Sequence, residues 1–354
     1  MAVLITDIYD SQAVAARRTQ DPSNAMGFVG KAFFPNRKKL GLSLKWIKTH
    51  TGLNAILKPS NFDAIPMIRA REGFKQESTE MIFFRESMTV REEDLMRLME
   101  IEDANSPFIG DIISSIYNDA ARLIDGAEIA AEVMRMALLA PKDGKPSIAI
   151  GTGEQESDNM VYGYDYDGDG TYKQKHYLKI QGTDTWDHPD TAKPLKDVQQ
   201  GTKYLKSIGV LPRYAMMNST TFDYLVENEQ IKNALITSGK TVDFTDEATV
   251  KEIFTRKTGL TPIIYDKMYI DYKGETQKFY PDDKVTIIGA GTLGSTYYGV
   301  TPEERTLMSN KNVDVAMLDN RIAIATKTEQ GPPIKTTTSV SQIVLPSYEG
   351  IDST

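Results

Sequence analysis

Three glycines, Gly289, Gly291 and Gly294, have the spacing of a loop that binds the pyrophosphate of a dinucleotide. The residues before them, KVTII at 284 to 288, predict the strand that such a loop follows. The loop also needs a helix behind it, because the helix N-terminus holds the phosphates. The residues after Gly294, STYYGVTPEE, are β-branched and aromatic, and their glycine and proline interrupt any helix. We therefore favour a turn between two strands, with a nucleotide-dependent oxidoreductase as the remote alternative.

Asp165, Asp167 and Asp169 resemble the opening of a calcium-binding loop, in which alternate carboxylates ligate the ion. The twelfth position of that loop is His176, where a bidentate glutamate belongs. The flanking segments VYGY and YLKI alternate like two strands and do not form amphipathic helices. We therefore expect a solvated hairpin tip, and a loose divalent-cation site at the three aspartates is the weaker alternative.

The chain has three histidines and no cysteine, which excludes disulfides, thiolate metal sites and cysteine nucleophiles. None of His50, His176 and His188 has the spacing of a nucleophile and its base, or of a second metal ligand. Asp187 and Asp190 lie beside His188, but the segment TWDHPD is typical of a proline-containing turn. We therefore predict no catalytic residue, no cofactor and no enzymatic activity.

The distribution of charge and hydropathy indicates a protein that contacts other subunits. The 354 residues can bury a sizeable core, and two lobes are the usual arrangement at this length. No apolar run reaches membrane-spanning length. Residues 1 to 75 hold 12 Lys and Arg against 5 Asp and Glu, whereas the remainder holds 29 against 44. This asymmetry suits nucleic-acid binding or a basic segment lying on the acidic body of the next subunit, and we favour the second.

The first 90 residues lack the pattern of an independent core. Residues 1 to 30 alternate short apolar clusters with polar residues, which predicts an extended arm ordered by a partner. Residues 31 to 90 predict an extended two-stranded loop broken by prolines, and such a loop is marginal on its own. Its basic residues and its tryptophan are the predicted contacts with a neighbouring subunit, namely Arg37, Lys38, Lys39, Lys45, Trp46 and Lys48.

A long helix is the strongest local signal. Residues 106 to 140 carry apolar residues at helical spacing, with Ser106 as the cap and Pro107 at the first position. Pro141 and Gly144 end the helix, which is about 50 Å long at about 1.5 Å per residue. Three shorter helices are predicted at 194 to 208, from 218 or 219, and at 246 to 257, and strands dominate from 262 to 345. The predicted fold class is α+β.

This order of elements resembles that of the major capsid proteins of tailed bacteriophages, in particular the lambda-type major head protein family. The segments RYAMMNSTTFDYLVEN, FYPDDKVTIIGAGTLGSTYYGVTPEE and IVLPSYEGID are similar to members of that family. The resemblance spans nearly the whole chain and implies the Hong Kong 97-like capsid fold with a spine helix. It implies an arm at 1 to 30, an extended loop at 31 to 90, a peripheral domain at 91 to 150 and about 283 to 340, and an axial domain at about 151 to 282 and 341 to 354.

The resemblance also implies a function. The expected protein self-assembles through head-to-tail contacts, as pentamers and hexamers, into the icosahedral head shell that encloses phage DNA. The expected partners are a separate scaffold protein, a portal, in some shells a decoration protein, and DNA contacted non-specifically, with no membrane. The expected locations are the virion head and, during assembly, the host cytoplasm. A cellular encapsulating shell of the same fold that holds a protein cargo is the alternative.

Overall fold

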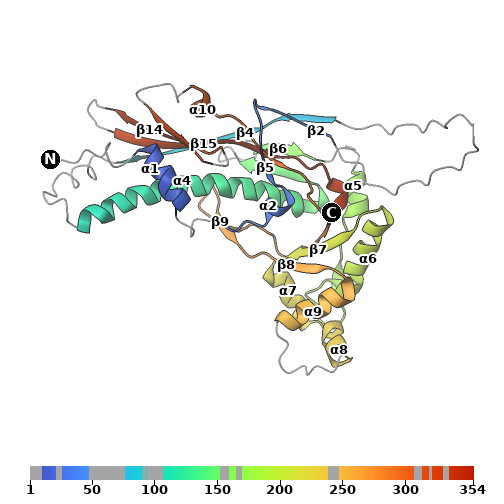
Figure 1. Cartoon of the computed structure of the whole chain (residues 1–354). Helices are drawn as coiled ribbons and strands as arrows, with labels where there is room; N and C mark the ends of the chain where they lie inside the picture. The colour runs from blue at the N-terminus through green and yellow to red at the C-terminus, as the bar shows by residue number, and fades with distance from the viewer. Residues whose placement is uncertain are drawn as a thin grey trace, which may run out of the picture. The chain divides into compact units, whose positions relative to one another are not determined.

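The computed structural model divides into two compact units, each made of segments that are far apart in the sequence (Figure 1). The structure describes residues 10–20, 26–47, 76–90, 93, 107–151, 159–164, 170–237, 247–306, 313–318, 321–329 and 335–354. Unit 1 comprises Met1–Leu44, Ser78–Met134 and Ser295–Ser347. Unit 2 comprises Lys45–Glu77, Arg135–Gly294 and Tyr348–Thr354.

The centre of unit 1 is a six-stranded sheet in the order β1-β12-β15-β14-β13, with β4 also paired to β15. The pairs of β15 with β12, β14 and β4 are antiparallel, as is the pair of β13 and β14, whereas β1 and β12 are parallel. The strands are β1 (Asn36–Lys38), β4 (Ile82–Val90), β12 (Thr296–Tyr298), β13 (Asp314–Met317), β14 (Ala323–Glu329) and β15 (Lys335–Pro346).

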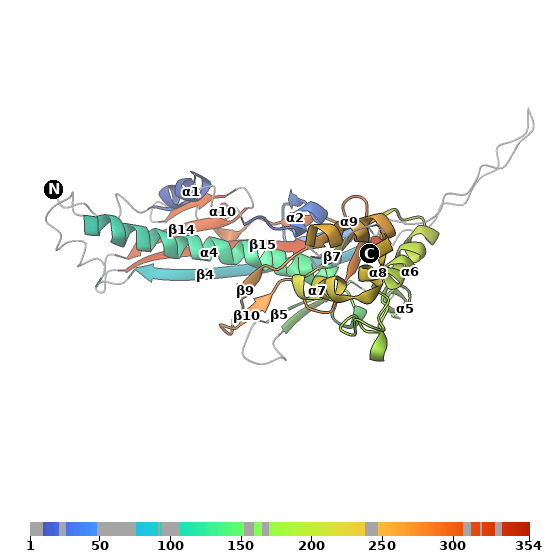
Figure 2. The same ribbon diagram turned by 90° about the horizontal axis from the view of Figure 1, so that it is seen from below.

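The long helix α4 (Pro107–Leu139) has 33 residues and confirms the predicted spine helix to within one residue at each end. It runs alongside β14 and β15 (Figures 1 and 2). Its predicted cap, Ser106, lies outside the described residues. One face of α4 packs against the sheet in an apolar cluster that includes Ala120, Leu123, Ile124, Ala127, Ile322, Ile324 and Val340. This burial stabilises the helix, because every third or fourth residue on that face is apolar.

The N-terminal region corrects the prediction of an extended arm. Residues 11 to 20 form helix α1 (Ser11–Gln20), and Gly30–Phe33 form the short helix α2. Val14 of α1 is 3% exposed and belongs to the same apolar cluster as α4. The prediction is therefore wrong for these residues, because alanine and arginine, which are strong helix formers, make up most of the segment AVAARR and Val14 docks the helix.

Unit 2 contains a three-stranded sheet in which β7 lies between β11 and β8. The helices α6, α7, α8 and α9 supply most of its apolar core, and α6, α7 and α9 confirm the three predicted shorter helices. The elements are β7 (Pro212–Met217), β8 (Thr261–Ile264), β11 (Thr286–Gly289), α6 (Pro194–Ser207), α7 (Ser219–Glu227), α8 (Glu229–Thr237) and α9 (Glu247–Thr258). Unit 2 also contains two hairpins, β5 (Ser147–Gly151) with β6 (Asn159–Gly163) and β9 (Met268–Ile270) with β10 (Thr276–Lys278). The short helix α5 (Thr171–His176) and the C-terminal part of α4, from Arg135 on, belong to the same unit.

Strand pairing in the structure cuts across two of the predicted segments. The extended loop was predicted to begin at residue 31 and end at 90, but β1 and β4 belong to the six-stranded sheet. The remaining loop begins with β2 (Ser43–Ile47), which pairs with β3 (Gln76–Glu80), and residues 48–75 lie outside the described part. The predicted boundary at 341 falls inside β15, one continuous strand of unit 1. Both differences come from strand pairing between distant segments, which local patterns do not report.

Candidate functional site

The first candidate contact residues lie on the edge strand β1. Among the described strands, β1 has one neighbour, β12, with Arg37 opposite Tyr297 and Lys38 opposite Tyr298. Arg37 and Lys38 are both exposed, as their burial pattern shows. An edge strand offers unpaired backbone groups, and exposed cations on it prevent unspecific strand pairing. The two side chains are therefore available to a charged partner.

Lys39 is more involved in the fold than the sequence predicts. Its backbone N–H donates to the carbonyl of Tyr298 at 2.8 Å, and its Nζ lies 5.8 Å from the centroid of the Tyr297 ring. The Nη1 of Arg321 donates to the carbonyl of Lys39 at 3.2 Å. Lys39 is half-buried, and its backbone hydrogen bonds attach the end of β1 to Tyr298 and Arg321.

The turn after Lys39 exposes two leucines that the sequence analysis missed. Leu40 is 78% exposed and Leu42 is 49% exposed, on either side of Gly41, whose φ is +82°. A positive φ is easily adopted by glycine, so the turn holds both leucines away from the core. Exposed leucines occur singly on most surfaces, but a pair beside two cations is typical of a protein contact. We name Arg37, Lys38, Leu40 and Leu42 the β1–β2 surface.

The structure corrects the role predicted for Trp46. Its side chain is 7% exposed and stacks on Tyr164, with ring centroids 5.8 Å apart and planes 24° apart. Tyr164 in turn makes an edge contact with Tyr348 at 6.4 Å. Trp46 therefore anchors the base of the extended loop within unit 2 and does not present an apolar surface to a neighbour. Lys45 beside it is exposed, and Lys48 lies outside the described residues.

Part of the basic N-terminal charge is paired within the chain. Arg18 forms an ion pair with Asp125 and lies 3.9 Å from Glu128, and Lys31 lies 3.9 Å from the other oxygen of Glu128. The backbone N–H of Gly30 donates to the buried carboxylate of Glu132 at 2.8 Å. Asp125, Glu128 and Glu132 share one face of α4, because they are three and four residues apart. The interpretation of the basic segment as a contact with the next subunit is therefore wrong for Arg18 and Lys31.

The glycine motif is a turn, as the sequence predicts. Gly289 ends β11, and a Cβ on it would lie 2.8 Å from Cγ1 of Val210 and 3.2 Å from the carbonyl oxygen of Ser353. Gly291 has a φ of +105°. The chain continues through Gly294 into β12 without a helix, and the next helix is α10 (Pro302–Thr306). The loop therefore lacks the helix N-terminus that would hold a pyrophosphate.

The aspartates Asp165, Asp167 and Asp169 lie outside the described residues. The predicted hairpin around them is wrong, because β6 pairs with β5 and the residues that follow form α5. His176 lies at the end of α5, where its ring stacks on Tyr172 at 4.7 Å and its Nδ1 is 2.7 Å from the carbonyl oxygen of Thr354. These contacts hold the C-terminal residues. Among the residues that the structure describes, no group of three or more His, Cys, Asp or Glu side chains could hold a metal ion.

The C-terminal end of α4 is capped by side chains from the region of β11. Lys284 Nζ donates to the carbonyl of Pro141 at 2.7 Å, and Thr286 Oγ1 donates to the carbonyl of Leu139 at 2.6 Å. Burial lowers the pKa of Lys284. A cation at a helix C-terminus is favourable, because the last carbonyls have no partner within the helix. These two residues therefore fix the end of the spine helix in unit 2.

We predict that Lys284→Met lowers the free energy of unfolding by about 1 to 3 kcal/mol, because it removes a charged donor from the partly buried carbonyls of Ala140 and Pro141. The measurement is urea unfolding followed by far-UV circular dichroism. Lys203→Met, which changes an exposed lysine of α6, is the matched control and should leave the midpoint unchanged. Equal midpoints for the two variants would show that Lys284 does not stabilise the helix end.

The fold defines the class of protein. A structure assigned as a prophage capsid protein of E. coli CFT073 matches with a TM-score of 0.56 and 12% sequence identity, over 98% of this chain and 97% of that one. A phage-related protein from Bordetella bronchiseptica RB50 matches with a TM-score of 0.50 and 11% identity, over 97% and 95% of the two chains. The chain therefore has the phage capsid fold, which confirms the predicted Hong Kong 97-like, α+β architecture.

The chain belongs to the family phage major capsid protein E, whose model matches residues 10–332. No curated protein matches the chain. Membership makes it a structural protein of the phage head shell, a multimeric assembly of the virion. The described part of the chain contains no helix that is long and apolar enough to cross a membrane.

Proposed function

We propose that copies of this chain join head to tail into rings of five and six that close an icosahedral shell around phage DNA. The observation that supports this most directly is the β1–β2 surface, where Arg37 and Lys38 lie beside the exposed leucines Leu40 and Leu42. The surface is basic and apolar, while residues 76 to 354 hold 44 acidic against 29 basic residues. A basic patch that meets a different, acidic patch makes a heterologous contact, and such contacts close into rings.

In this proposal unit 1 is the peripheral domain and unit 2 is the axial domain. Lys45, which is exposed at the base of the extended loop, adds to the contact with the neighbouring subunit, together with Lys48. A separate scaffold protein guides assembly in the host cytoplasm, a portal occupies one vertex, and a decoration protein can bind outside. DNA is held non-specifically, because a shell lining needs no base recognition.

The content of the particles separates this proposal from a cellular encapsulating shell. Particles purified from infected or induced cells should contain double-stranded DNA that resists added nuclease and is released when the shell is disrupted. Mass spectrometry should then detect portal and tail proteins in the same fraction. Particles that contain one abundant enzyme and no DNA would favour the encapsulating shell.

A nucleotide-dependent oxidoreductase remains the remote alternative, and the turn at Gly289, Gly291 and Gly294 argues against it. Titration of the purified protein with NADH or NADPH, followed by fluorescence, should give no saturable binding. Saturable micromolar binding that a Gly289→Val variant abolishes would restore this alternative.

A further inference from the structure

Helix α6 carries exposed lysines on one side. The apolar side of the helix is buried in the core of unit 2, so the remaining positions face outward. The exposed cations at its start and along its length are Lys193, Lys196, Lys203 and Lys206. Lys196, Lys203 and Lys206 are seven and three residues apart, so they lie on the same side of the helix.

Gln199 joins the end of α9 to this side of α6. Its side-chain amide donates to the carbonyl of Lys257 at 3.1 Å. Arg256 and Lys257 are exposed there, in the last turn of α9. The two helices therefore present their cations together, and we name the six residues the α6–α9 surface: Lys193, Lys196, Lys203, Lys206, Arg256 and Lys257.

The stability of the fold does not explain the lysines at the start of α6. Lys193 and Lys196 lie at the N-terminus of the helix, where the macrodipole makes a cation unfavourable. The one acid of the helix, Asp197, is engaged by Trp186, whose Nε1 donates to its Oδ2 at 3.0 Å. Within the part of the chain that the structure describes, none of the six cations forms an ion pair. The surface therefore stays positive, although residues 76 to 354 are acidic as a whole.

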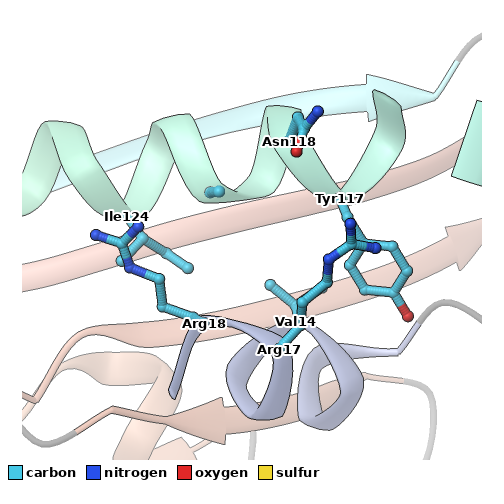
Figure 3. A pocket seen from close by; sticks show the side chains of 7 residues that line it. Val14, Arg17, Arg18, Tyr117, Asn118 and Ile124 are labelled. Carbon is cyan, nitrogen blue, oxygen red and sulfur yellow. The ribbon is translucent and has the colours of Figure 1, made fainter. Parts of the chain in front are cut away.

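The arginines of helix α1 are less available to an anion. Arg18 forms an ion pair with Asp125, and the guanidinium of Arg17 lies 4.9 Å from the centroid of the Tyr117 ring. Both arginines line a cleft of about 70 Å³ between α1 and α4, as Figure 3 shows. An anion has to displace these contacts before it binds the α1 arginines, whereas the lysines of α6 have no ion pair to give up.

We propose that the α6–α9 surface binds the phosphates of double-stranded DNA without regard to sequence. Lysine is a point charge on a flexible stem, so it attracts phosphates without the fixed geometry that reads base edges. At about 1.5 Å per residue, Lys193 and Lys206 are about 20 Å apart along α6, a length over which one duplex presents several phosphates. That the bound DNA is packaged DNA rests on the proposed function.

A titration of DNA with the unassembled subunit tests the binding. Fluorescence anisotropy of a labelled duplex of about 30 base pairs is measured between about 50 and 200 mM salt. The triple variant Lys196→Gln, Lys203→Gln, Lys206→Gln should bind about tenfold or more weakly at the lowest salt. It should also reduce the slope of log K against log salt by about 2 to 3, because each phosphate contact contributes about 0.9.

The matched control removes three exposed lysines of other elements, with the substitutions Lys267→Gln, Lys273→Gln and Lys335→Gln. It changes the net charge by the same amount and should leave the affinity and the slope unchanged. Equal losses in the two triple variants would overturn the proposal, because total charge alone would then explain the binding. A variant of the α6 lysines that binds DNA normally but loses its scaffold protein would also overturn it, in favour of an acidic scaffold segment as the partner.

Cross-linking in filled particles separates this inference from the proposed function. A photoreactive residue in place of Lys203 should cross-link to the DNA inside closed shells, and one in place of Lys273 should not. Cross-links at both positions, or at neither, would overturn the assignment of the surface. If the wild-type chain forms no closed shells, the proposed function fails, while the titration still decides whether the α6–α9 surface binds DNA.

Discussion

The double charge reversal Arg37→Glu with Lys38→Glu is expected to abolish shell assembly and to leave a folded, soluble subunit. Both side chains are exposed on β1, so their replacement should not disturb the sheet. The change reverses the charge of the β1–β2 surface. Two glutamates opposite an acidic partner weaken the binding free energy by several kcal/mol and lower the association rate. The measurement is sedimentation velocity at moderate salt, with circular dichroism to confirm the fold.

The matched control reverses two exposed lysines of α6, Lys203→Glu with Lys206→Glu, and changes the net charge by the same amount. This control should assemble like the wild type if the position of the charge matters and the total charge does not. Replacement of Leu40 and Leu42 by serine should weaken assembly independently of salt. Wild-type particles from the Arg37 and Lys38 variant would remove the electrostatic part of the proposed contact.

Phe254→Ala is expected to lower the free energy of unfolding by about 3 to 5 kcal/mol, because it leaves a cavity in a closed core. Phe254 is 0% exposed and packs in the cluster of unit 2 with Leu225 and Val250. The measurement is urea unfolding of the unassembled subunit. Ile236→Ala, at a side chain that is 58% exposed, should change the value by no more than about 0.5 kcal/mol. Equal effects of the two variants would show that this cluster does not hold unit 2 together.

Local signals in the sequence predict the helices α4, α6, α7 and α9 and most strands correctly. Helix α4 is predicted because its apolar face, Pro107 at its start and Pro141 behind its end are all encoded within the segment. The cap of α7 is another such signal, since the side chain of Asn218 accepts from the N–H of Thr221 at 2.9 Å. These elements follow from contacts between residues that are near in sequence.

Elements defined by distant contacts are not predicted. The strand β1 joins the sheet through β12, about 260 residues away, so local patterns place its basic residues in a loop. Trp46 is buried against Tyr164, and α1 is ordered by contacts with β13, β14 and α4, which no local pattern reports. The exposed pair Leu40 and Leu42 does have a local signal, two leucines around a glycine within a basic stretch.

Electron microscopy of the purified protein, alone and with its candidate scaffold protein, shows whether copies of this chain form a shell. We expect uniform closed shells, rings of five or six copies, or tubes, because the same head-to-tail contact can close or extend. A monodisperse monomer or dimer under both conditions would contradict the claim that this chain builds a shell.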